Sequence, residues 1–449
     1  MTKNVPSKGG LSRRSFLKVT SAAGAAIAFP TFIPASALGR DGRPAPSERI
    51  TMGVVGWGMQ GPENTKEFMK LSDVQIVAAC NIDKEHLKKA VDVINGHYKK
   101  KVVKTYHDYR KMMSRHDIDA VMIAVPDHWH ELVAVEAARN RKDIYGEKPL
   151  AKTIAEQQRI VRAVRENGRI WQTGSWQRST GSFHKAAEIV RNGLIGKITH
   201  VEVGLPSGHT DFAKTGSFTQ IAKPPPELDY NRWIGPSRME PYIKARVHMN
   251  WRWNYDTGGG QLMDWVGHHL DIAHWGLGFD LSGPHEVEAH GQFPAQDAIW
   301  NTATEFRVEM KYPDNIKVTM AGGDDDIKSG TKWIGTDGWV YVDRGKFDAS
   351  DEDWMDIKEL PDDEAKIKLY RSINHWRNFI DCVKSRQKTI APAEVAHHSA
   401  IPGHLGYISM ALGRKLRWDV ETEQILDDPT GSVMLSRLYR PPFDHWERA

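Results

Sequence analysis

The stretch ITMGVVGWGMQGPENTKEF, residues 50–68, decides the fold. It begins with a short apolar run rich in β-branched residues, which is typical of a buried strand. A G-x-G-x-x-G pattern follows at Gly56, Gly58 and Gly61, and a helix-period segment comes next. In this context the first glycine permits a tight turn, the second lets a pyrophosphate approach the backbone, and the third allows close packing of helix on strand. The stretch therefore predicts a dinucleotide-binding loop at a helix N-terminus.

Strand and helix patterns continue to alternate as far as residue 173. The strand-like segments are ITMGVV, VQIVAAC, VVKTY, AVMIAV, DIYGEK and IWQTG. Such alternation indicates a doubly wound parallel sheet, with its ligand at the carboxyl ends of the strands. We expect residues 50–173 to form a Rossmann dinucleotide-binding domain.

The second strand should end near an acidic residue that binds the adenosine ribose. Asn81 stands at that position, and Asp83 follows two residues later. No arginine comes directly after them to hold a 2′-phosphate, although Lys84 is near. We expect NAD as the cofactor, and NADP stays open.

Beyond Gly174 the pattern changes. The segments EVEAHGQF, TATEFRVEMKY, NIKVTMAGG and KWIGTDGWVYVD alternate with period two, as in a half-exposed antiparallel sheet. The predicted fold class is α/β: an N-terminal Rossmann domain, then an α+β domain at 174–420 with an open, mainly antiparallel sheet. A C-terminal tail is expected at 421–449.

The N-terminus has the features of an export signal. The run SRRSFLK at 12–18 resembles a twin-arginine motif, and the apolar stretch at 19–33 is too short and too weakly apolar to span a bilayer stably. Ala35-Ser36-Ala37 fits a cleavage site. We expect a signal peptide at 1–37, a linker at 38–49, passage through the twin-arginine translocation machinery to the periplasm, and no stable membrane anchor.

Composition narrows the class of protein. The 449 residues include 61 Lys and Arg against 57 Asp and Glu, a net charge of +4, with 40% hydrophobic and 26% charged residues. The first 37 residues hold five basic and no acidic residues, so the net charge of the remaining residues is 56 − 57 = −1. These values argue against a disordered chain, a polytopic membrane protein and a nucleic-acid binder. Two cysteines exclude a disulfide framework.

The run from Val125 to Thr153 resembles the glucose–fructose oxidoreductase / inositol dehydrogenase / MocA (Gfo/Idh/MocA) family, whose hallmark is Glu147-Lys148-Pro149. The resemblance covers about 50–420 and includes the glycine loop and GGGQLMDWVGHHLDIAHW. It implies a Rossmann domain followed by an α/β domain with an open sheet. It also implies that Lys148 reaches both nicotinamide and substrate.

The residues themselves support this chemistry. An ammonium at the end of a strand can stabilise the oxygen of a hydroxyl as hydride leaves, and histidine accepts a proton near neutral pH. Asp264, His268 and Asp271 are spaced i, i+4, i+7, so a regular helix places them on one face. Asp264 and His268 match positions that inositol dehydrogenase-like members use. We expect His268 as general acid/base, Asp264 as its partner or a substrate ligand, and Asp271 in a structural role.

The expected catalytic residues are Lys148, His268 and Asp264. The expected cofactor contacts are Gly56, Trp57, Gly58, Met59, Gln60, Gly61, Asn81, Asp83, Pro126, His130, Glu147 and Lys148. The expected substrate contacts are Lys148, Trp176, Arg178, Trp253, Asp264 and His268. No metal site is expected, because adjacent histidines on a helix point to different sides and no spacing resembles a zinc site.

We therefore predict an exported NAD(P)-dependent oxidoreductase. It would transfer hydride between a tightly held nicotinamide and a secondary alcohol of a sugar, glycoside or cyclitol, and it would form a homo-oligomer. Two alternatives stay open. One is an NAD-dependent glycosidase or lyase that oxidises a sugar transiently and eliminates a substituent. The other is a non-catalytic sugar- or nucleotide-binding protein, since a fold does not determine its function.

Overall fold

The structure, a computed structural model, describes residues 44–361 and 364–445. The predicted signal peptide and the linker as far as residue 43 lie outside the described residues. The chain divides into two compact units at Ile50, and the turn η3 (Pro46–Glu48) belongs to the first of them. The second unit holds two domains.

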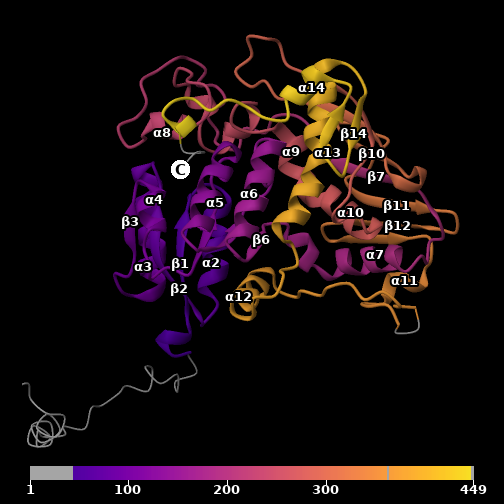
Figure 1. The fold of residues 1–449 in the computed structure, drawn as a ribbon, viewed down its shortest axis with the longest axis horizontal. Coiled ribbons are helices and arrows are strands. Elements are labelled where there is room, and N and C mark those ends of the chain that lie inside the picture. Colours follow the sequence, from indigo (N-terminus) through magenta and orange to yellow (C-terminus); the bar gives the residue numbers. More distant parts are fainter. Residues whose placement is uncertain (1–43, 362–363, 446–449) are drawn as a thin grey trace, which may run out of the picture. The chain divides into compact units, whose positions relative to one another are not determined.

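The first domain is built on a six-stranded parallel sheet, ordered β3-β2-β1-β4-β5-β6 (Figure 1). Its strands are β1 (Ile50–Val55), β2 (Val74–Cys80), β3 (Lys104–Tyr106), β4 (Ala120–Ile123), β5 (Asp143–Gly146) and β6 (Trp171–Thr173). Helices cover both faces, so the central strands β4 and β5 are fully buried, and β4 is apolar throughout. This is the predicted doubly wound sheet.

Three of the five helices of this domain begin at a capping side chain. The five are α2 (Gln60–Met69), α3 (Lys84–Tyr98), α4 (Tyr109–Met113), α5 (His130–Arg139) and α6 (Ile154–Glu166), with the short turns η4 (Asp127–Trp129) and η5 (Trp176–Ser179). The side chains of Asp83, Asp108 and Thr153 accept hydrogen bonds from the first turns of α3, α4 and α6. Each of these helices therefore starts at the carboxyl side of the sheet, around the predicted ligand position.

The second domain contains a nine-stranded sheet, ordered β13-β12-β11-β7-β10-β9-β8-β14-β15. Its strands are β7 (Ile198–Leu205), β8 (Glu286–Gln292), β9 (Glu305–Lys311), β10 (Lys317–Gly322), β11 (Gly330–Gly335), β12 (Trp339–Asp343), β13 (Lys346–Ala349), β14 (Leu416–Asp419) and β15 (Gln424–Leu426). Strands β7 and β10 pair in parallel, and the other strand pairs of the described residues are antiparallel. Burial alternates along β9, as the period-two pattern predicts. The open, mainly antiparallel sheet is confirmed.

Helices cover one face of this sheet. They include α7 (Gly181–Arg191), α9 (Gly260–Trp265), α10 (Asp271–Leu277) and α13 (Ala393–Leu412), with a π-helical turn, η8 (Val266–Leu270), between α9 and α10. Helix α12 (His375–Ser385) packs instead on α2 of the first domain. The shorter elements are α8 (Tyr230–Ile234), η6 (Lys244–Arg246), η7 (His248–Trp253), η9 (Pro313–Asn315), α11 (Asp353–Asp356), α14 (Pro429–Val433) and η10 (Phe443–His445). Helix α13 runs beside α6 and packs on η8 and β8, so it joins the two domains (Figure 1). Within the described part of the chain, no helix combines the length and the apolar character that crossing a membrane requires.

The segment between β7 and α9 returns to the first domain. Lys84 N donates to Glu227 O at 3.0 Å, and Asp229 N donates to Ile82 O at 3.2 Å. Ile82 also packs against the apolar cluster around Trp233. The second domain therefore covers the carboxyl end of β2, where a bound adenosine is expected.

The described part of the predicted tail is joined to both domains. Strand β15 pairs with β14, and Arg437 Nε donates to Glu156 Oε1 at 2.6 Å. Tyr439 donates to the same carboxylate at 2.8 Å. Residues 424–445 are thus part of the packed structure, because β15 extends the sheet edge and the ion pair neutralises a buried glutamate on α6.

Buried neutral histidines join the elements. His375 of α12 donates from Nε2 to Thr173 O at 2.8 Å, and its Nδ1 lies 2.8 Å from Ser179 Oγ. Burial lowers the pKa of His375 to about 4, and burial lowers the pKa values of His274 and His404 to about 3. Each ring is neutral in the native state and takes up a proton only at the expense of folding.

This arrangement predicts acid sensitivity. The pKa of His375 is lower in the folded state than in the unfolded state. The neutral ring therefore contributes its full share to the free energy of unfolding above about pH 6.5, and this share is lost progressively as the pH falls toward the folded-state pKa. The free energy of unfolding should therefore fall between about pH 7.5 and about pH 5. In His375→Gln, which keeps an amide donor for Thr173 but cannot titrate, this fall should be smaller by about 1–2 kcal/mol. Urea unfolding at each pH measures it.

The control is His290→Gln, since the His290 side chain is exposed. It should leave the pH dependence as in the wild type. An unchanged pH dependence in His375→Gln would contradict the assignment of a neutral buried ring.

Candidate active site

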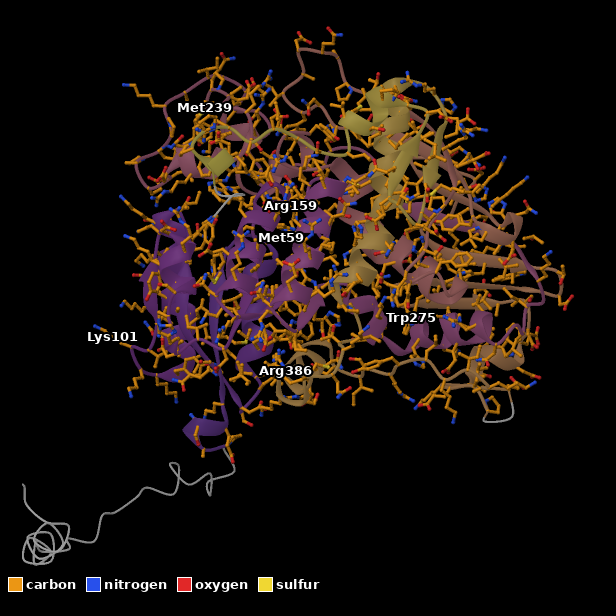
Figure 2. All side chains as sticks on the ribbon, viewed as in Figure 1. Met59, Lys101, Arg159, Met239, Trp275 and Arg386 are labelled. Carbon is orange, nitrogen blue, oxygen red and sulfur yellow. The ribbon has the colours of Figure 1, made fainter. Side chains whose placement is uncertain are left out.

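A cavity of about 240 Å³ lies at the carboxyl ends of the first sheet. Its walls come from the glycine turn, the ends of β2, β4 and β5, and the segment that returns from the second domain. The lining residues include Gly56, Trp57, Gly58, Met59, Gln60, Asn81, Asp83, His86, Pro126, Asp127, Glu147, Lys148, Arg232, Trp233, His248, Trp251 and Arg252. Met59 marks the glycine turn in Figure 2, and Trp275 marks α10 in the second domain. Ten of the twelve expected cofactor contacts line this cavity, and Gly61 and His130 do not.

The three loop glycines have different roles. Gly56 has φ +93°, and a Cβ atom there would lie 2.1 Å from Ala124 O. A Cβ atom at Gly61 would lie 2.5 Å from Gly56 O, so this glycine serves packing, and it does not line the cavity. A Cβ atom at Gly58 would meet nothing within 4 Å, and Gly58 does line the cavity. The space beside Gly58 is therefore a cradle for a group that approaches the backbone, which fits a pyrophosphate.

The far end of the cavity is polar. Asn81 Oδ1 accepts from Asp83 N at 2.9 Å, and Asp83 Oδ1 caps α3. The other carboxylate oxygen of Asp83 lies 3.6 Å from His248 Nε2, and the rings of His86 and His248 lie 4.7 Å apart. One ligand atom of each of Asp83, His86 and His248 lies within 4.8 Å of the others, a grouping that could hold a cation. Sequence reasoning missed it because His248 comes from the other domain.

Lys148 connects the cavity to the second domain. Its Nζ donates to Asp264 O at 2.6 Å and to Asp264 Oδ1 at 3.0 Å, and its side chain is only 9% exposed. Pro149 follows through a cis peptide bond. Through its bonds to Asp264 of α9, the Lys148 side chain reaches across the domain border.

Asp264 is held in its ionised form. Burial alone would raise its pKa, but the Lys148 ammonium and the Arg252 guanidinium outweigh burial and hold the pKa of Asp264 well below its usual range. Arg252 Nε donates to the same Oδ1 at 3.0 Å. Neither Asp264 nor His268 is among the cavity's lining residues. Lys148 thus lies between the cavity and the carboxylate.

The helix that carries His268 is not regular. The π-helical turn η8 separates Asp264, in α9, from Asp271, at the start of α10. The predicted common face is therefore divided: Asp264 binds Lys148, whereas Asp271 binds Arg178. His268 Nδ1 is buried without a hydrogen-bonding partner among the described residues. Burial, with the charges of Lys148 and Arg344, holds the pKa of His268 well below its usual range, so the ring is neutral.

Two tryptophans flank His268. Trp176 and Trp265 meet its ring edge-on, with centroids 6.3 Å and 5.5 Å away. The Arg344 guanidinium lies 4.7 Å from the ring of Trp176 and 4.4 Å from that of Trp265, and it donates to Gln177 Oε1. Such an aromatic and cationic wall suits the C–H faces and hydroxyls of a sugar ring.

Asp127 is a buried carboxyl that faces the cavity. It is 3% exposed, and its Oδ1 has no hydrogen-bonding partner among the described residues. Burial, reinforced by the Asp264 carboxylate, raises the pKa of Asp127 to about 7, against the opposing charges of Arg252 and Lys148. Burial and the Arg437 guanidinium lower the pKa of the nearby Lys152.

Two predicted cofactor residues differ in position. Glu147 lines the cavity and accepts from Asn64 Nδ2 at 2.7 Å; burial raises its pKa against the Lys148 charge. His130 does not line the cavity. Its ring nitrogens lie 2.7 Å from Pro149 O and 2.9 Å from Val125 O, so it joins the β4 loop to the proline turn.

Two predicted substrate residues are buried elsewhere. Arg178 is 2% exposed and binds Asp271 at 2.7 Å and Asp280 at 2.7 Å. Trp253 is fully buried, and its Nε1 donates to Thr210 O at 2.8 Å. Both residues stabilise the second domain. Sequence reasoning placed them near substrate because they neighbour Trp176 and the aromatic run before the glycines.

Arg344 is a further residue of this site that sequence reasoning missed. It lies in the turn between β12 and β13, far along the chain from Trp176 and Trp265. Its sequence surroundings, VDRGK, predict only a turn.

The chain matches two family models of the oxidoreductase family Gfo/Idh/MocA. The NAD-binding Rossmann fold model matches residues 50–175, and the C-terminal alpha/beta domain model matches residues 181–445. A twin-arginine translocation signal model matches residues 10–30.

Individual relatives are distant. A myo-inositol 2-dehydrogenase from Thermotoga maritima is 21% identical over 388 residues, 84% of this chain and 97% of that protein. The chain spans about half the length of other curated relatives that it matches, such as a glycosyl hydrolase family 109 protein from Shewanella baltica, which is 28% identical over 211 residues (43% of this chain, 45% of that protein).

Solved structures share the fold. A WlbA dehydrogenase from Bordetella pertussis, solved with NADH and UDP-GlcNAcA, has a TM-score of 0.61 at 15% identity and covers 83% of this chain and 99% of its own. The sheet order, the glycine turn and both family models agree: the chain belongs to the Gfo/Idh/MocA family of oxidoreductases.

Proposed function

We propose that this protein is an exported NAD-dependent oxidoreductase that acts on a secondary alcohol of a sugar, glycoside or cyclitol. The observation that carries the proposal is the position of Lys148, which lines the dinucleotide cavity and hydrogen-bonds Asp264 of the second domain. A substrate hydroxyl near this ammonium would lie between the cofactor site and the aromatic wall of Trp176 and Trp265.

Residues along the cavity would serve each part of the dinucleotide. Gly58 and the first turn of α2 would hold the pyrophosphate, Asn81 and Asp83 the adenosine ribose, and Glu147 and Lys148 the nicotinamide end. When bound, nicotinamide accepts or returns a hydride at its ring. A measurement of nucleotide affinity with both NAD and NADP will show which of the two the site prefers.

The Lys148 ammonium would act on the oxygen. It is held by Asp264, and a developing alkoxide would receive one of its hydrogen bonds more strongly than the neutral hydroxyl does. The neutral His268 ring would accept the hydroxyl proton, as a general base requires. Asp264, kept ionised by Lys148 and Arg252, would orient the lysine and stabilise an imidazolium while it exists.

Export would separate the enzyme from the cytoplasmic nicotinamide pool. The residues Arg232, Trp233, His248 and Trp251 of the returning segment line the cavity, so they would cover a bound dinucleotide. This supports a cofactor that leaves slowly and is recycled in place by a second carbonyl substrate.

Redox-assisted glycoside cleavage is the second candidate. It is favoured by the similarity to a glycosyl hydrolase family 109 protein and by the same lysine and histidine, which would serve a transient oxidation equally well. Release of free aglycone without net reduction of the cofactor would support this candidate over the dehydrogenase.

The first prediction concerns cofactor binding. Gly58→Ala should fold normally, because the added Cβ meets no atom within 4 Å, yet it should weaken nucleotide binding by about tenfold or more by filling the cradle. Titration calorimetry with NAD and with NADP measures the affinity, and thermal unfolding measures stability. Gly96→Ala in α3, also without contacts, is the matched control and should bind as the wild type does. Equal affinity in both variants would contradict the assigned loop.

The second prediction concerns chemistry. Lys148→Met should reduce turnover by about 10²–10³-fold and His268→Asn by about 10²–10⁴-fold, because the first removes oxygen stabilisation and the second removes the proton acceptor. Both should retain bound nucleotide. Absorbance of reduced nicotinamide, followed with a panel of sugars, glycosides and cyclitols, measures turnover.

Lys197→Ala, on an exposed side chain, is the control and should be fully active. Unchanged turnover in both site variants would contradict the roles assigned to Lys148 and His268. A wild type that turns over no member of the panel would favour a non-catalytic binding protein.

A further inference from the structure

Asp127 is the buried ionisable group that the proposed reaction leaves unused. It begins η4, directly after Pro126 at the carboxyl end of β4, and it lines the cavity together with Lys148. Its side chain is almost completely buried, and its Oδ1 lacks a hydrogen-bonding partner among the described residues. A carboxylate in such a place costs free energy that folding does not recover, so its presence points to function.

Burial disfavours the ionised form of Asp127, and charged groups from four segments add to this effect or oppose it. Asp264 of α9 opposes ionisation, whereas Arg252 of η7, Lys148 after β5 and Lys152 before α6 favour it. These opposing effects leave the carboxyl able to hold or release a proton near neutral pH. Small changes of charge in the cavity will therefore change its protonation.

His268 is poorly suited to keep a proton. Its ring is buried, and Lys148, Arg344 and His269 all disfavour an imidazolium there. It can accept the hydroxyl proton while hydride leaves, but the proton then needs a resting place with higher affinity. Asp127, on the cavity side of Lys148, offers one.

We propose that Asp127 stores the proton that the substrate hydroxyl loses, and that it acts through Lys148. This inference rests on the proposed function. The carbinol C–H bond breaks and its electron pair leaves with the hydrogen as hydride, so the carbon is oxidised to a ketone and nicotinamide is reduced. The hydroxyl O–H bond breaks and His268 takes its proton. The Lys148 ammonium gives one of its protons to the Asp127 carboxylate and receives the proton from His268, so Lys148 ends as an ammonium and His268 as a neutral ring. Ketone reduction runs the same transfers backwards.

The cofactor's charge would drive this storage. The oxidised nicotinamide ring is a cation and favours the Asp127 carboxylate, whereas the reduced ring is neutral and does not. Binding of NADH should therefore leave more protons on the protein than binding of NAD does. This difference can be measured without any sugar, so it is independent of turnover.

The test is titration calorimetry at neutral pH on protein freed of nucleotide, with NAD and NADH as probes, in two buffers of different ionisation enthalpy. In the wild type, NADH should bind with a larger proton uptake than NAD, by up to about one proton per site. Asp127→Asn should bind both nucleotides without this difference. Asp127→Glu, which restores a carboxyl, should recover part of it.

Glu131→Gln is the matched control, since Glu131 is also buried but does not line the cavity. It should retain the wild-type difference. Two results would overturn this inference while leaving the proposed function standing. One is a difference in proton uptake between NADH and NAD that persists in Asp127→Asn, and the other is a wild type that binds both nucleotides without such a difference. A wild type that binds neither nucleotide overturns the proposed function and this inference with it.

Discussion

The buried ion pair between Lys148 and Asp264 is the interaction on which the site depends. It joins the first domain to the second, and both side chains are largely removed from water. Desolvation of two charges is costly, so such a pair persists only when further hydrogen bonds satisfy it. Here Lys148 also donates to Asp264 O, and Arg252 donates to the carboxylate. The site is therefore formed only when the two domains are packed together.

Further contacts hold the two domains together around this ion pair. Helix α13 packs on α6 and η8, and Arg437 and Tyr439 of the C-terminal segment bind Glu156 on α6. These contacts fix the position of η8, and with it His268, relative to the cis-proline turn that carries Lys148. Precise placement of catalytic groups requires such support, because a shift of about 1 Å can remove most of their effect.

The fold could be predicted because its determinants are local. The glycine turn at Gly56 and Gly58 and the alternating strand and helix patterns are read within short windows, and the parallel sheet follows from them. Lys148 and Asp264 could also be found, since each lies in a short motif. The separation of Asp271 from Asp264 could not be predicted, because a single π-helical turn changes which face a residue occupies and no sequence period signals it. Arg178 was misplaced because its partners Asp271 and Asp280 lie far along the chain. Arg344 and the trio of Asp83, His86 and His248 depend on contacts between distant segments.

The charges around the reacting position have a consequence for the chemistry. Lys148, Arg252 and Arg344 bring three positive charges, and Asp264 supplies a carboxylate whose pKa is held low. A surplus of positive charge in a buried site stabilises an alkoxide more than it stabilises a neutral hydroxyl, and it disfavours a lasting imidazolium. The same surplus is reduced when a second carboxyl ionises. The protonation of Asp127 and the charge on the substrate oxygen are therefore coupled through one electrostatic field, whichever reaction the site performs.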